Sequence, residues 1–60
     1  MKKEQIALIF KFLEQGYNSV TAFEHTKLGL DPYRNPDDRT ERAFAKKVAE
    51  ILRELLPGNF

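Results

Sequence analysis

Hydrophobic residues recur at helical spacing near the start of the chain. Four of them fall on one face at the i, i+3, i+4, i+7 spacing of an amphipathic helix: Ile6, Ile9, Phe10 and Leu13. Leu8 and Phe12 lie four residues apart and widen this face to one side. Gly16 follows, and glycine commonly ends a helix because it adopts the left-handed conformation without strain. The pattern predicts a helix over about 3–15.

A shorter second helix is predicted over about 19–28. Either Asn18 or Ser19 can cap its start, because a side-chain oxygen there accepts a hydrogen bond from an unpaired backbone N–H. Gly29 can end it. Two threonines lower the helix propensity of the segment. The helix therefore depends on the packing of its apolar positions, which are Val20, Ala22, Phe23 and Leu28.

The clearest helix start in the chain lies after the Asp-Pro turn at 31–32. Asn35 occupies an N-cap position and Pro36 the first helical position, where its missing N–H costs nothing. Asp37 and Asp38 follow, and their negative charges suit the positive end of a helix dipole. These signals predict a third helix over about 36–56, which Pro57-Gly58 stops.

Two apolar stripes run side by side along this third helix. The first consists of Phe44, Val48, Ile51 and Leu55, and the second of Ala45, Ala49, Leu52 and Leu56. The opposite side carries Arg39, Arg42, Lys46, Glu50 and Arg53. Without a repeat or a linker, the sequence predicts an all-α fold. We expect one compact three-helix domain over residues 1–60, with the long C-terminal helix packed across the first two.

Composition narrows the class of protein. The chain has 60 residues, no cysteine, and ten basic against nine acidic side chains, which leave a net charge of +1. Such a short chain buries only about 60% of its unfolded surface, and it has no disulfide to add stability. The balanced charge gives no global field for nucleic acid or an anionic membrane. Apolar runs are too short for a membrane span, and charged residues interrupt any signal peptide, so we expect a cytoplasmic protein.

No pattern of catalytic residues is present. His25 is the only histidine, and we expect it at the surface or edge of the second helix rather than in a catalytic role. The glycines stand alone, so no phosphate-binding loop exists. The loop after Asp31 fails as a calcium site, because Pro36 stands where glycine is needed and Arg42 where a bidentate glutamate is needed. We expect no enzyme activity, no cofactor and no metal.

The basic side of the third helix raises the possibility of a DNA- or RNA-binding regulator. Its candidate residues are Arg34, Arg39, Arg42, Lys46 and Arg53. Three helices would suffice for a helix-turn-helix domain, but neither interhelical connection has the usual turn. Glu50 and Glu54 also reduce the positive charge, and Lys46–Glu50 would be an ordinary i, i+4 pair on a solvated face. We favour the interpretation that this basic side is a solvated face.

The apolar surplus points instead to a protein partner. Helix one has a wider apolar arc than one neighbouring helix covers, and the third helix offers two stripes. The residues left over for an interface would be Leu8, Phe12, Leu52 and Leu56. They could instead close the core, with Tyr17, Tyr33 and Phe60 filling gaps. Our leading hypothesis is a small non-enzymatic binding protein that acts through a protein partner or as a homodimer.

Overall fold

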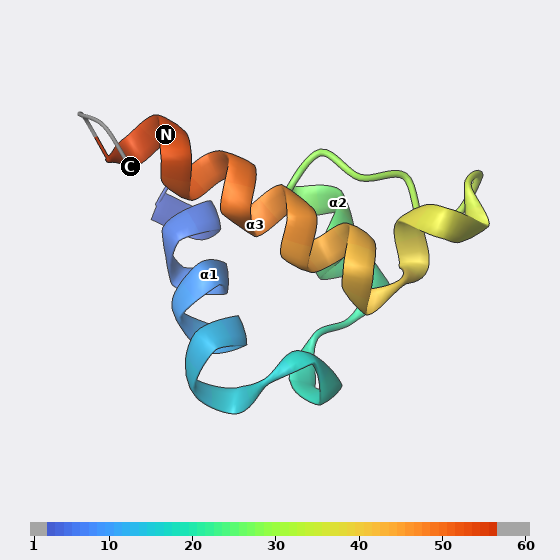
Figure 1. Cartoon of the computed structure of the whole chain (residues 1–60). Helices are drawn as coiled ribbons and strands as arrows, with labels where there is room; N and C mark the ends of the chain where they lie inside the picture. The colour runs from blue at the N-terminus through green and yellow to red at the C-terminus, as the bar shows by residue number, and fades with distance from the viewer. Residues whose placement is uncertain (1–2, 57–60) are drawn as a thin grey trace.

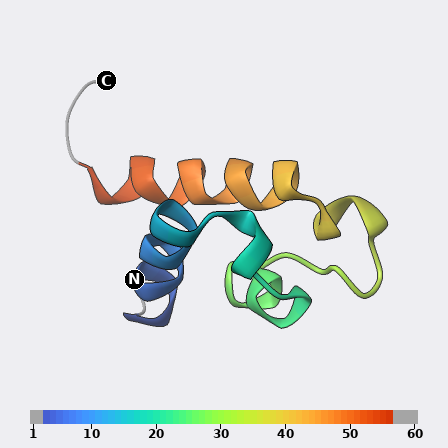
Figure 2. The same ribbon diagram turned by 90° about the horizontal axis from the view of Figure 1, so that it is seen from below.

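The computed structural model describes residues 3–56, and three α-helices form the framework of this part of the chain. They are α1 (Lys3–Gln15), α2 (Ala22–Lys27) and α3 (Glu41–Leu55), with short 3-10 helices η1 (Tyr17–Ser19) and η2 (Pro36–Arg39) between them. α3 crosses α1 and α2, which both lie on the same side of it (Figures 1 and 2). The predicted all-α fold is therefore confirmed. None of the helices within residues 3–56 is long and apolar enough to cross a membrane.

The core lies where α1 and α2 meet the inner face of α3. Its buried hydrophobic residues are Leu8, Ile9, Leu28, Phe44, Val48 and Ile51. Phe44 is completely buried at the centre, and the ring of Phe12 packs against it with 5.1 Å between the ring centroids. Aromatic pairs at this spacing add to the free energy gained by burying their surface. Three of the four residues in the first predicted stripe of the third helix, Phe44, Val48 and Ile51, thus belong to the core.

The predicted end of helix one is confirmed, while the predicted start of helix two is wrong. α1 ends at Gln15, and Gly16 follows with a φ of 79°. Thr21, rather than Asn18 or Ser19, caps α2: its hydroxyl accepts from the Glu24 N–H, and the Glu24 carboxylate accepts from the Thr21 N–H. This reciprocal capping box satisfies two unpaired donors, whereas Ser19 bonds back to the Gly16 carbonyl and belongs to η1.

The predicted third helix is divided in two. Asn35 accepts from the Asp37 N–H and Pro36 takes the first helical position, as expected, but the element that they begin is the single turn η2. Thr40 then adopts an extended conformation, and its hydroxyl caps α3 by accepting from the Ala43 N–H. α3 therefore begins at Glu41. The predicted stop at Pro57-Gly58 and the predicted packing of Phe60 lie outside the described residues.

Several predicted core positions lie on the surface. Phe10 and Leu13 are 58% and 61% exposed, because α1 meets α3 through the neighbouring arc that contains Leu8, Ile9 and Phe12. Phe23 on α2 is 62% exposed. Tyr33, expected as a gap filler, is also exposed, and so are Ala49 and Leu55 on α3. The core is thus smaller than the apolar pattern indicates.

Candidate interaction surfaces

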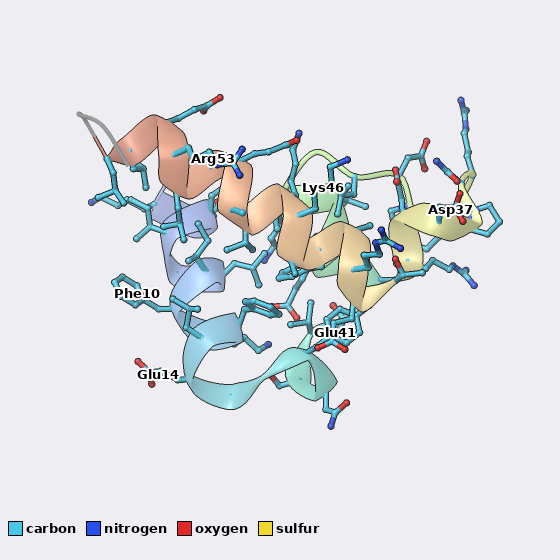
Figure 3. All side chains as sticks on the ribbon, in the orientation of Figure 1. Phe10, Glu14, Asp37, Glu41, Lys46 and Arg53 are labelled. Atoms are coloured by element: carbon cyan, nitrogen blue, oxygen red, sulfur yellow. The ribbon has the colours of Figure 1, made fainter. Side chains whose placement is uncertain are left out.

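A stripe of exposed residues runs along α1, and one of its members, Ala7, also lines a hollow beside α2. It consists of Lys3, Ala7, Phe10 and Glu14, and we call it the α1 outer stripe. The intervals of four, three and four residues place all four on one face of a helix. Phe10 and Glu14 project from the same side of α1, away from α2 and η2 (Figure 3). Leu13 is exposed beside the stripe, so two large apolar side chains meet solvent here.

The predicted protein-interaction residues lie mostly in or beside the core. Leu8 is buried, so the prediction that it contacts a partner is wrong. Phe12 and Leu52 are half-buried and pack against the core. Only Leu56 is exposed. The apolar surplus is present, and two of the residues that carry it, Phe10 and Leu13, are on the α1 face that the pattern assigned to the core.

On the side of α3 that faces away from α1 and α2, no element of residues 3–56 covers the helix (Figure 2). Arg42, Lys46 and Arg53 are exposed on this α3 open face, and Figure 3 shows Lys46 and Arg53 there. The Nζ atom of Lys47, not that of Lys46, lies 3.6 Å from a Glu50 carboxylate oxygen. The expected Lys46–Glu50 pair is therefore absent from the described residues, in which none of the three open-face cations pairs with a carboxylate.

The other two candidate cations belong to the loop between α2 and α3. The Arg39 side chain donates from Nε to the Pro32 carbonyl at 2.7 Å, so it holds this loop in shape. Arg34 is exposed, and its backbone N–H donates to the Asp31 carboxylate. The loop from Leu28 to Thr40 is much longer than the turn of about three or four residues in a helix-turn-helix unit. The five predicted cations therefore do not form one recognition helix.

His25 lies in the core at 1% exposure, so its predicted surface position is wrong. Its Nδ1 donates to the Asp38 carbonyl at 2.7 Å, because a backbone carbonyl can only accept. Its Nε2 lies 2.8 Å from the oxygen of the Tyr17 hydroxyl, whose single proton is donated to the Arg39 carbonyl. Both ring nitrogens are therefore occupied. The cluster ties α2 to η1 and η2, and it leaves no atom of His25 for a ligand.

The surroundings of Tyr17 and Glu24 shift the pKa values of both side chains. Burial raises the pKa of the Tyr17 hydroxyl, and the nearby Glu41 charge raises it further. Burial alone would also raise the pKa of the Glu24 carboxyl. Lys11, 3.0 Å away, contributes a hydrogen bond and a positive charge, and Thr21 contributes further hydrogen bonds. Together these interactions outweigh the effect of burial and lower the pKa of the Glu24 carboxyl. The Lys11–Glu24 pair thus joins α1 to α2.

Hollows of several hundred Å³ lie on the surface of the described residues. One between α1 and α3 has a volume of about 470 Å³ and is lined by Gln5, Leu28, Lys47, Glu50, Ile51, Glu54 and Leu55. This lining contains no histidine and no hydroxyl group that could act as a nucleophile. Within residues 3–56, no group of three or more His, Cys, Asp or Glu side chains is placed to hold a metal ion.

Comparison with known proteins gives no family for the chain. No protein-family model matches it, no curated protein resembles it at a significant level, and no solved structure matches its fold significantly. The two exposed faces, the α1 outer stripe and the α3 open face, are therefore argued from their own chemistry.

Proposed function

We propose that this chain is a small, non-enzymatic binding protein that docks onto a protein through the α1 outer stripe. The observation that carries the proposal is the exposure of Phe10 and Leu13, one turn apart, beside a core that is already closed. Exposed apolar clusters on small proteins mark contact sites, and aromatic side chains are enriched among the residues that dominate binding energy. The cytoplasmic location expected from the sequence stays a prediction.

A photo-crosslinking experiment tests the proposal. A benzophenone amino acid replaces Phe10 in the full chain, and the chain is irradiated in the cells that naturally produce it. The matched control carries the same group at Phe23, which has nearly the same exposure but lies on α2. We expect covalent protein adducts from position 10 and few from position 23. Equal yields at both positions, or none at position 10, would contradict the proposal.

A second candidate function is supported by the α3 open face. Arg42, Lys46 and Arg53 extend over about 16 Å of helix and have no carboxylate partner in the described residues. Ala45 and Ala49 on the same helix are small, so a nucleic-acid backbone could approach it closely. The candidate function is salt-dependent binding of duplex nucleic acid through phosphate contacts.

Titration of the chain into mixed-sequence duplex DNA at low salt tests this second candidate. The variant Arg42→Ala/Lys46→Ala should weaken binding and flatten its salt dependence, since two phosphate contacts are lost. The control Lys3→Ala/Lys27→Ala removes the same charge away from the α3 open face and should bind more tightly than the test variant. Equal weakening by both pairs, or no binding at micromolar concentrations, would exclude this candidate.

A further inference from the structure

The α1 outer stripe has a sequence that complements itself. From the N-terminal to the C-terminal end of α1 it carries a cation, a small residue, an aromatic ring and an anion, at Lys3, Ala7, Phe10 and Glu14. We infer that the protein partner is a second copy of this chain, bound through antiparallel pairing of the two α1 helices. This inference rests on the proposed function, since it names the occupant of the same surface.

Helix geometry sets the register of the pair. At about 1.5 Å of rise per residue, Lys3 and Glu14 are separated by about 16 Å along the axis of α1. A twofold axis through the midpoint of that interval places Lys3 of one copy opposite Glu14 of the other. The same operation places Phe10 opposite Ala7. Each ring then fills the space above a small side chain, which allows the helix axes to approach to about 8–10 Å.

The flank of the stripe fits the same register. Ile6 is half-buried and Leu13 exposed, and both lie to the same side of Phe10 on the helix. In an antiparallel pair with this twofold axis, Leu13 of one copy faces Ile6 of the other. The association would thus cover both of the large apolar side chains that α1 exposes. α1 stands at the edge of the molecule, with α2 on its other side (Figure 1).

The charges select this arrangement over two others. Parallel pairing would place Lys3 against Lys3 and Glu14 against Glu14, and like charges in contact disfavour a complex. An anionic membrane would attract the Lys3 end of the stripe and repel the Glu14 end. Antiparallel pairing forms two equivalent ion pairs, because the twofold symmetry repeats every contact. The area is small, so we expect a weak, concentration-dependent dimer.

Sedimentation equilibrium of the full chain between about 10 µM and 1 mM tests the inference, in a range suited to a weak interface. The apparent mass should rise from that of one chain toward that of two. Phe10→Ala should weaken the dimer about tenfold or more, because a central aromatic anchor is lost. Phe23→Ala, which truncates an equally exposed phenylalanine on α2, should leave the dimer unchanged.

Charge reversal tests the register. Lys3→Glu and Glu14→Lys should each weaken the dimer by about fivefold, since symmetry repeats the new repulsion twice. The double variant Lys3→Glu/Glu14→Lys should restore wild-type association. Both changes suit the dipole of α1, because they place an anion near its start and a cation near its end. The single variants should therefore fold normally, as circular dichroism will show.

The outcomes separate the inference from the proposed function. A chain that stays monomeric at 1 mM, or a double variant that fails to recover, overturns the antiparallel pairing. The crosslinks from position 10 test the proposed function independently. If they join the chain to a different protein and no adduct has twice the chain mass, the stripe is a docking surface but its partner is not a second copy. Absence of every position-10 adduct would overturn both.

Discussion

Replacing Tyr17 with phenylalanine tests whether the buried His25 cluster holds the fold together. The substitution removes one oxygen atom and keeps the ring, which packs edge-on against His25 and Phe44. His25 Nε2 then loses its partner, and the Arg39 carbonyl loses the hydroxyl that donates to it. In the described residues no buried side-chain polar atom lacks a hydrogen bond, so the variant would create the first.

The expected loss of stability is large for a chain of this size. Leaving a buried polar atom without a partner costs about 1–3 kcal/mol. A domain of about 60 residues has only about 3–5 kcal/mol of stability to lose. At about 4–8 °C per kcal/mol, a loss of about 2 kcal/mol lowers Tm by roughly 8–16 °C. Thermal unfolding followed by circular dichroism at neutral pH measures this shift.

A matched variant and a double-mutant cycle make the result decisive. Tyr33→Phe removes the same atom from a residue that is 64% exposed, so its Tm should not change. His25→Phe should also destabilise the protein, because the Asp38 carbonyl loses its donor. The double variant Tyr17→Phe/His25→Phe should lose less free energy of unfolding than the sum of the losses in the two single variants. The reason is that neither side chain of the pair then remains as an unpaired polar group. A Tm within about 2 °C of wild type for Tyr17→Phe would refute the reasoning.

Three further predictions concern the supports of the fold. Glu24 has a lowered pKa in the folded state, so its contribution to stability is complete above its unfolded pKa of about 4.5 and is lost as the pH falls through the folded value. Glu24→Gln should therefore destabilise the protein at pH 7 more than at pH 3 in urea unfolding, and an equal effect at both would contradict the Lys11 pairing. Thr40→Ala should cost about 1 kcal/mol through loss of the α3 cap, whereas Thr26→Ser, which keeps a hydroxyl, should cost less. Gly29→Ala should lower Tm, because the φ of 87° strains any residue with a Cβ, and an unchanged Tm would show that the turn relaxes.

Local sequence rules predicted the helix ends that depend on local chemistry. Gly16 and Gly29 both adopt positive φ after a helix, and Asn35 caps the turn that Pro36 begins. The rules failed where two caps compete within a few residues. Asn18 and Thr21 are both acceptable caps, and the capping box with Glu24 decides between them. Asn35 and Thr40 compete in the same way, and the Thr40 cap divides the predicted third helix.

The candidate surfaces depended on packing that a helical wheel does not contain. The wheel correctly indicated an apolar arc on helix one wider than one neighbour covers. Which part of the arc is buried depends on where α3 crosses it, and α3 covers Leu8 and leaves Phe10 exposed. His25 was placed at the surface because its partners, Tyr17 and the Asp38 carbonyl, come from other segments of the chain. Its spacing of three residues from the buried Leu28 was the available signal.

The most direct test of the central claim is an NMR dilution series of the full chain from about 1 mM to 10 µM, which spans the range expected of a weak interface. If the α1 outer stripe is the interface, the amide shifts that change with concentration will cluster at Lys3, Ala7, Phe10 and Glu14. The amides of Arg42 and Lys46 on the α3 open face will not change. Shifts that are independent of concentration, or that change on α3 instead, would contradict the pairing of two chains through this stripe.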